Sequence, residues 1–402
     1  MKLLTTDELH YVQYKDAFFD PKNMTGGNRF DEILDVFDRM ILVGRCKKVF
    51  QEPQCQRVDN DRIEFFPVTD FNGYKHVFRR LKTFCDCNRS VGIADRYWLR
   101  APGFMSSMIG FWLRRAGIPY FSHLVGNIGD IAEVTMERFP ACVAKSTRKV
   151  VDYKFKQYMK GCWGSLSVTE NILQSLYPSS CPCNDIGASD VRLDNTFFQK
   201  TRRNYNPEIF EIINVATLEP YKGHKYLLKA LNQIKNQRAW QLHLVGEGQL
   251  LASLKSLSKE LEISDRVVFH GHLGMNTGIK QLLDNCHLFV LSSFQEGMPR
   301  VVLEAMARAL PVISTDVGGV YEVIPEQWLV SRKDSIALAE KIALLWNDPA
   351  LLEASSRQNY EKVQAFRLDR LGKLRREWLT WMKVHGHEAD NVSWAEYRSK
   401  LI

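Results

Sequence analysis

Short apolar runs alternate with amphipathic helical patterns through the C-terminal half of this 402-residue chain. The apolar runs predict strands at Ile209–Ala216, Trp240–Val245, Arg266–His270, Leu288–Ser292 and Pro311–Thr315. The patterns between and after them predict helices at Lys225–Lys235, Gln249–Leu261, Lys280–Asp284 and Pro299–Ala309, and a helix start at Tyr321–Ile324. Strands that are apolar throughout are typical of a parallel sheet with helices on both faces.

The N-terminal half shows the same alternation less regularly. Strands are expected at Arg39–Arg45, Tyr97–Arg100, Tyr120–Val125 and Gly164–Thr169, and helices at Phe30–Phe37, Phe104–Ala116 and Glu170–Tyr177. A chain of this length exceeds one ordinary hydrophobic core, so two domains are expected. The polar stretch Arg202–Pro207, which ends in proline, is the expected boundary. The predicted fold class is therefore α/β, with two Rossmann-like parallel-sheet domains at residues 1–205 and 206–375.

Residues 376–402 are expected to form a helical tail that crosses back onto the N-terminal domain. A basic amphipathic helix is predicted at Leu368–Val384, and it contains Trp378 and Trp381. Tryptophans at helical spacing pack against protein more often than they insert into a membrane. We therefore expect both indoles to be docked on the protein, with insertion into lipid as the alternative.

The net charge of +8 is a mild basic excess that is spread along the chain, which does not favour a dedicated nucleic-acid binder. Lysine and arginine outnumber acids most clearly between Lys75 and Arg115. This basic stretch is either a solvated surface or a face that is attracted to anionic lipid or to a phosphate-bearing acceptor.

The nine cysteines are irregularly spaced and include no Cys-x-x-Cys pair. They predict reduced thiols and no metal site. The N-terminus lacks the apolar segment of a signal peptide, since Asp7 and Glu8 come early. The longest apolar candidate, Ala101–Leu113, is too short to cross a bilayer. These features predict a cytoplasmic protein with at most a peripheral contact at the inner face of the plasma membrane.

Glycine and charged residues collect directly after the expected strands of the C-terminal half. The segments are Lys222–Gly223, Gly246–Glu247–Gly248, Gly271, Glu296–Gly297 and Gly318–Gly319. Because ligands of parallel α/β sheets bind at the carboxyl ends of the strands, these five loops together predict a ligand site.

Two glutamates, Glu296 and Glu304, flank the proline that is expected to open a helix. Proline suits the first helical turn because its missing N–H would be unpaired there anyway. The unpaired backbone N–H groups of Gly297 to Val301 can then bind an anionic or hydroxyl-rich ligand. Glu304 follows one turn later, and its two acceptor oxygens suit a vicinal diol such as a ribose.

From about Ile209 to Leu329 the chain resembles the retaining nucleotide-sugar glycosyltransferases of glycosyltransferase family 4, which have the two-domain GT-B fold. The segments that support this resemblance are Lys222–Gly223, Val245–Gly248, Phe269–Gly271, Glu296 with Glu304, and Pro311–Gly319. The N-terminal half resembles bacterial surface-polysaccharide members (O-antigen, capsule and exopolysaccharide) loosely, at Arg100–Gly103 and His123–Asn127. Asn127 stands where an aspartate is expected, so a carboxylate role at that position is open.

The resemblance implies two domains that face each other across a cleft, with the donor held by the C-terminal one. Lys222 would neutralise the diphosphate and Glu304 would bind the ribose. Thr217 stands where the family usually has an arginine. Arg300 or another basic residue could supply the missing positive charge. The implied catalytic residues are Glu296 and Lys222. The implied donor-binding residues are Thr217, Gly223, Gly246, Glu247, Gly248, His270, Gly271, Gly297, Met298, Arg300, Val301 and Glu304, and the acceptor-side residues are Gly26, Gly27, Arg100, His123, Gly126 and Asn127.

The expected activity is sugar transfer from a nucleotide-diphosphate sugar to a glycan or polyprenyl-diphosphate-linked acceptor, with retention of configuration. The implied pathway is bacterial surface polysaccharide biosynthesis. No cofactor or metal is expected, because the leaving phosphate can take the acceptor proton. A nucleotide-sugar 2-epimerase on the same fold is one alternative. A non-catalytic nucleotide-sugar-binding subunit is the other, and Thr217 and Asn127 favour it.

Overall fold

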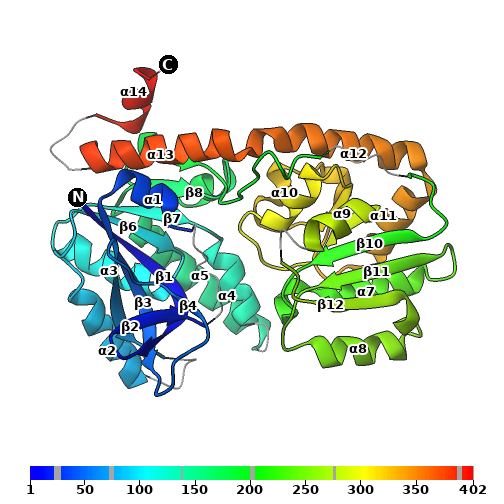
Figure 1. Ribbon diagram of the computed structural model, residues 1–402, viewed down its shortest axis with the longest axis horizontal. Coiled ribbons are helices and arrows are strands. Elements are labelled where there is room, and N and C mark those ends of the chain that lie inside the picture. Colours follow the sequence, from blue (N-terminus) through cyan, green and yellow to red (C-terminus); the bar gives the residue numbers. More distant parts are fainter. Residues whose placement is uncertain are drawn as a thin grey trace. The chain divides into compact units, whose positions relative to one another are not determined.

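The computed structural model of the protein describes residues 1–21, 29–71, 77–136, 139–199, 204–274, 278–386 and 392–401. The chain divides into two compact units (Figure 1). The first comprises Met1–Ile128, Ser146–Ala188 and Gly372–Ile402, and the second comprises Gly129–Lys145 and Ser189–Leu371. These limits differ from the expected ones at 205 and 375, because a segment of the N-terminal half joins the second unit and the tail joins the first.

The sheet of the first unit is mainly parallel. Its parallel strands run in the order β5 (Ile63–Thr69), β3 (Arg39–Lys48), β1 (Lys2–Tyr14), β6 (Arg96–Ala101), β7 (Tyr120–Leu124), β8 (Cys162–Ser167) and β9 (Ile186–Gly187). Two short strands, β2 (Ala17–Asp20) and β4 (Gln56–Arg57), add an antiparallel extension. The strand order reverses between β1 and β6, and the crevice at such a point is the usual ligand position in open α/β sheets.

The helices of the first unit pack around this sheet and include the C-terminal tail. They are α1 (Asp31–Val36), α2 (Val77–Asn88), α3 (Phe104–Arg115), most of α5 (Ala141–Met159), α6 (Ile172–Leu176), most of α13 (Leu368–His385) and α14 (Trp394–Ser399). Trp378 and Trp381 are fully buried and lie edge-on to the ring of Phe121. The expectation that these indoles dock on the protein is therefore confirmed.

The sheet of the second unit is parallel, as the apolar runs predicted. Its order is β12 (Val267–Gly271), β11 (Trp240–Val245), β10 (Phe210–Val215), β13 (Leu288–Leu291), β14 (Val312–Thr315) and β15 (Leu329–Val330). The helices are α4 (Ile128–Thr135), α7 (His224–Gln233), α8 (Leu251–Glu260), α9 (Lys280–Asn285), α10 (Arg300–Ala307), α11 (Ser335–Asn347) and α12 (Pro349–Val363). Here the order reverses between β10 and β13, so the loops after these two strands flank the expected ligand crevice.

Three expected helices have different limits in the structure. Helix α10 begins at Arg300 and ends at Ala307, because Pro299 has an extended ψ of 105° and Ala309 has a φ of +53°. A 3-10 turn at Gly318–Glu322 takes the place of the expected helix start, and α6 is shorter than predicted. Among the described helices, none is both long enough and apolar enough for a bilayer span.

Candidate functional site

The five glycine-containing loops of the second unit form one connected edge at the carboxyl ends of its strands. Backbone hydrogen bonds join the first loop to the second (Leu218 N to Glu247 O, 2.8 Å) and the second to the third (Gly246 N to Gly271 O, 2.8 Å). The first also joins the fourth, from Phe294 N to Tyr221 O (2.7 Å). The fourth joins the fifth, from Gly319 N to Gly297 O (2.5 Å). The sheet therefore brings the predicted donor-side segments together.

Two of these glycines are required by close approach of the backbone. Gly223 has a φ of +68°, and a Cβ there would overlap the carbonyl oxygen of Ser292. Gly246 has a φ of +138°, and a Cβ there would overlap the carbonyl oxygen of Ala216. Any larger residue would strain the backbone and push neighbouring loops apart. The glycines thus allow the loops to approach as closely as they do.

The two predicted catalytic residues contact each other. Lys222 Nζ lies 2.7 Å from Glu296 Oε1, and both side chains are largely buried. Lys222 ends a short 3-10 turn at Pro220–Lys222 after β10, and Glu296 lies in the loop after β13. A cation and an anion from the two loops that flank the ligand crevice are therefore paired. The pair keeps both charges neutralised while presenting them to a ligand.

Glu304 is buried inside α10, with 9% of its surface exposed. Burial raises the pKa of its carboxyl to about 7, and the nearby charge of Arg300 opposes this rise. The described residues give this carboxyl no hydrogen-bond donor. A buried carboxyl without donors is costly, so the site favours a ligand that brings hydroxyl groups to it.

The remaining predicted donor-side residues lie around this edge. Met298 is buried and Val301 is half-buried, whereas Thr217, Glu247 and Arg300 are exposed. Arg332, a basic residue of the same unit, contacts Asp130 (3.4 Å) and the carbonyl of Asp316 (3.3 Å). The charge of Arg332 is therefore already engaged by these two acidic residues.

His224, directly after Gly223, was missed by the sequence reasoning. It is almost fully buried at the start of α7, and neither ring nitrogen has a hydrogen-bond partner in the part of the chain that the structure describes. Burial and the charge of Lys222 lower its pKa to about 4, so the ring is neutral at neutral pH. In the sequence, His224 fits an ordinary amphipathic helix pattern. Its place two residues after Lys222 is the feature that could have indicated a role.

On the acceptor side, the structure brings two predicted residues together. An Arg100 guanidinium nitrogen lies 3.2 Å from His123 Nδ1, and the His123 ring stacks on Trp98 with 4.8 Å between centroids. Asn127 is hydrogen-bonded within the first unit, because its Oδ1 accepts from the hydroxyl of Tyr177 at 2.7 Å. Gly126 is buried beside it, and Gly26 and Gly27 lie outside the described residues.

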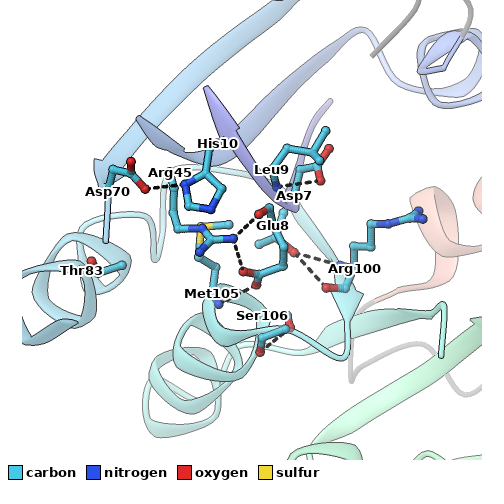
Figure 2. A network of polar contacts seen from close by, with 12 residues as sticks. Asp7, Glu8, Leu9, His10, Arg45, Asp70, Thr83, Arg100, Met105 and Ser106 are labelled. Atoms are coloured by element: carbon cyan, nitrogen blue, oxygen red, sulfur yellow. Dashed lines mark hydrogen bonds and ion pairs between the residues drawn. The ribbon is translucent and has the colours of Figure 1, made fainter. Parts of the chain in front are cut away.

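A polar network that the sequence did not predict lies where the strand order of the first sheet reverses (Figure 2). Glu8 of β1 accepts a 2.8 Å hydrogen bond from the backbone N–H of Met105 at the start of α3. The guanidinium of Arg45 donates to the Glu8 carbonyl and lies 3.6 Å from Glu8 Oε2. Burial raises the pKa of Glu8, while Arg45 and the Met105 amide oppose the rise. Glu8 is thus a further acceptor-side candidate.

Within the described ranges, no group of three or more His, Cys, Asp or Glu side chains could hold a metal ion. An Asp-x-Asp sequence does occur at Asp59–Asp61. Asp59 accepts from the backbone N–H of Phe18 (2.7 Å) and from Arg57 (2.7 Å), so it braces the antiparallel extension of the first sheet.

Comparison with known proteins agrees with this arrangement. Residues 195–362 match the family model of "Glycosyl transferases group 1". Protein CapJ of Staphylococcus aureus is 22% identical over 92% of this chain and 93% of its own length. The putative colanic acid biosynthesis glycosyltransferase WcaL of Escherichia coli K12 is 28% identical, over 49% of this chain and 52% of its own.

A solved structure supports the same fold over nearly the whole chain. Anabaena HepE, in complex with UDP and glucose, has a TM-score of 0.65 at 17% identity, and the match covers 94% of this chain and 99% of that one. The two parallel-sheet units are those of the GT-B architecture, and the matched domain contains the Lys222–Glu296 pair and Glu304. Residues 195–362 therefore form a domain that matches the group 1 glycosyltransferases, and the chain is similar to proteins named for bacterial surface polysaccharide synthesis.

Proposed function

We propose that this enzyme transfers a sugar from a nucleotide-diphosphate sugar, with retention, to a glycan or lipid-linked oligosaccharide during bacterial surface polysaccharide synthesis. The observation that supports this most is the pairing of Lys222 with Glu296, together with the buried, donor-free carboxyl of Glu304 on α10, the helix that follows Glu296. One cation and two acids then come from the loops after β10 and β13 and from the helix that the second of these loops leads into.

Each part matches one portion of such a donor. The Lys222 ammonium and the N-terminal N–H groups of α10 suit the negative diphosphate. The Glu304 carboxyl suits the ribose hydroxyls, and Glu296 suits hydroxyls of the transferred sugar. Uracil is the proposed base, because the similar Anabaena HepE was solved with UDP, with UDP and glucose, and with UDP-glucose.

When the donor binds, Lys222 exchanges part of its contact with Glu296 for the diphosphate. In the reaction, the bond between the anomeric carbon and the diphosphate oxygen breaks, and the acceptor oxygen bonds to that carbon on the same face. The acceptor proton passes to the leaving diphosphate. Lys222 and the α10 amides stabilise the charge that develops on the leaving group. The proposed route needs no metal and no carboxylate nucleophile.

An exposed apolar and basic face of the first unit supports a peripheral membrane contact. Phe78 and Leu81 of α2 are 88% and 57% exposed, and Arg79 and Lys82 lie exposed beside them. Part of the basic stretch has another role, since Arg96 is buried and donates to the carbonyls of Met382 and Lys383. Exposed apolar side chains among cations favour an anionic bilayer surface, which would bring the enzyme close to lipid-linked acceptors.

Sedimentation with vesicles tests this contact. The wild type should sediment with vesicles that contain anionic lipid and remain free with neutral ones. Replacing Phe78 and Leu81 with serine should weaken sedimentation, whereas the matched change of the exposed Ile336 and Leu344 on α11 of the second unit should not. Equal sedimentation of both variants would reject this face as the contact.

Incubation with a panel of nucleotide sugars and polyprenyl-diphosphate-linked acceptors tests the activity itself. Transfer with one donor is expected, together with release of the nucleoside diphosphate. Lys222→Ala should lower turnover by about 10²–10³-fold, as for loss of one group that stabilises the leaving charge. Conversion of the donor alone into an epimer would instead show an epimerase, and binding without turnover would show a non-catalytic subunit.

A further inference from the structure

Three side chains form a hydrogen-bonded row across three adjacent strands of the second unit. Glu211 lies on β10, His243 on β11 and His270 on β12. Glu211 Oε2 is 2.8 Å from His243 Nε2, and His243 Nδ1 is 2.9 Å from His270 Nε2. The row ends at His270, which precedes Gly271 and is one of the predicted donor-binding residues.

The carboxylate at one end fixes the protons of both rings. An ionised carboxylate can only accept, so His243 must carry its proton on Nε2. If the His243 ring carries this one proton, its other nitrogen, Nδ1, is an acceptor. His270 must therefore donate from Nε2, which leaves a lone pair on His270 Nδ1. Burial and the neighbouring His243 lower the pKa of His270, so its ring is neutral at neutral pH.

His270 lies near the carboxyl end of β12, at the edge where the predicted donor loops meet. His243 is level with Val268 in the register of β11 and β12, so His270 lies two residues nearer the carboxyl edge. Because His270 Nε2 is hydrogen-bonded to His243, the Nδ1 of the same ring is directed away from His243. Among the described residues, none forms a hydrogen bond to His270 Nδ1. The backbone of the next residue, Gly271, is bonded to the Gly246 loop.

We propose that His270 Nδ1 accepts the N3–H of the uracil base, and that Glu211 and His243 are positioning residues that hold His270 in the accepting tautomer. This inference rests on the proposed function, and it adds two residues that no donor-site motif contains. A uracil presents a ring N–H to such an acceptor. A base without a ring N–H would leave the lone pair unpaired.

The tautomers can be measured without a ligand. Histidine-selective ¹⁵N labelling of the full chain, with His243→Gln and His270→Gln for assignment, reports which ring nitrogen carries the proton. Both rings should carry it on Nε2 at neutral pH. A proton on Nδ1 of either ring would overturn the proposal, whatever the nucleotide experiments show.

Calorimetry with UDP and N3-methyl-UDP tests the base contact. The wild type should bind UDP about tenfold more tightly than N3-methyl-UDP, as for the loss of one hydrogen bond. N-methylation also adds bulk, so the decisive variant is Glu211→Leu. Position 211 lies away from the base, but without its carboxylate the tautomers of His243 and His270 are no longer fixed. In Glu211→Leu, the preference for UDP over N3-methyl-UDP should shrink several-fold.

The matched control is Gln241→Leu, a half-buried residue of β11 two positions before His243. It should keep the wild-type preference. Equal preferences in Glu211→Leu and Gln241→Leu would overturn the positioning role while leaving the proposed donor intact. Absence of UDP binding to the wild type would instead reject uracil as the base, and with it both the proposed donor and the base contact.

Discussion

Lys222 and Glu296 are 74 positions apart in the chain, yet their side chains meet at 2.7 Å. They meet because β10 and β13 are neighbours at the point where the strand order reverses, so the loops after them flank one crevice. Lys222 is thus paired with an anion from the neighbouring loop. A diphosphate must compete with Glu296 for Lys222, which makes the two residues unequal in their effects on binding.

Replacing Glu296 should therefore separate binding from turnover. In Glu296→Ala, Lys222 loses its competing partner, so UDP should bind as tightly as in the wild type or several-fold more tightly. Transfer should fall by about 10²-fold or more, because the sugar loses its contact. Calorimetry and a transfer assay on the same preparation measure both. Loss of UDP affinity comparable with that of Lys222→Ala would contradict the competition.

Glu304 should make nucleotide affinity depend on pH. Its pKa of about 7 means that the carboxyl gains a proton as the pH falls through neutrality. Protonation removes acceptor capacity for the ribose hydroxyls, so the affinity for UDP should decrease from pH 8 to pH 6. Glu304→Gln should bind weakly and almost independently of pH. Titrations at several pH values measure this, and parallel curves for the two proteins would argue against a ribose contact.

His224 and Glu304 should have opposite effects on stability over nearly the same pH range. The folded-state pKa of His224 is lowered from 6.5 to about 4, so the unfolded chain binds more protons and stability rises with pH across that window. The pKa of Glu304 is raised from 4.5 to about 7, so the folded chain binds more protons and stability falls as the pH rises. Each shift corresponds to roughly 3 kcal/mol in the free energy of unfolding.

The two slopes should nearly cancel in the wild type and appear in the variants. With increasing pH, His224→Phe should lose stability and Glu304→Gln should gain it. Urea unfolding between pH 4.5 and pH 7.5 measures both trends. Identical pH dependence in the wild type and the two variants would show that neither group titrates as its burial demands.

Thr217 offers a gain-of-function test. The resemblance places an arginine at this position, and the side chain here is exposed at the edge of the donor loops. Thr217→Arg should add a charge-assisted contact to the diphosphate and tighten UDP binding about tenfold. Thr217→Leu adds bulk without charge and should not. If the two variants bind UDP equally, the diphosphate does not lie beside this loop.

The sequence predicted the second unit well because its strands are mostly apolar and five of them are followed by a glycine-containing loop. Strand β1 was missed because Asp7, Glu8 and His10 interrupt its apolar pattern. Their side chains contact Tyr11 of the same strand, the Met105 amide of α3 and Asp70 after β5, respectively. The Glu211–His243–His270 row was also missed. Its members are separated widely in sequence, and only the register of three parallel strands brings them together.

Glu8 should affect the acceptor and not the donor. Its carboxyl lies at the start of α3, where the strand order of the first sheet reverses, and 30% of the side chain is exposed. Glu8→Gln keeps an oxygen for the Met105 amide but loses the charge that an acceptor hydroxyl can donate to. We expect the KM for the acceptor to rise about tenfold, as for loss of one charge-assisted hydrogen bond, with unchanged UDP affinity. The exposed Glu64→Gln of β5 is the matched control, and an unchanged acceptor KM in Glu8→Gln would assign this network to folding alone.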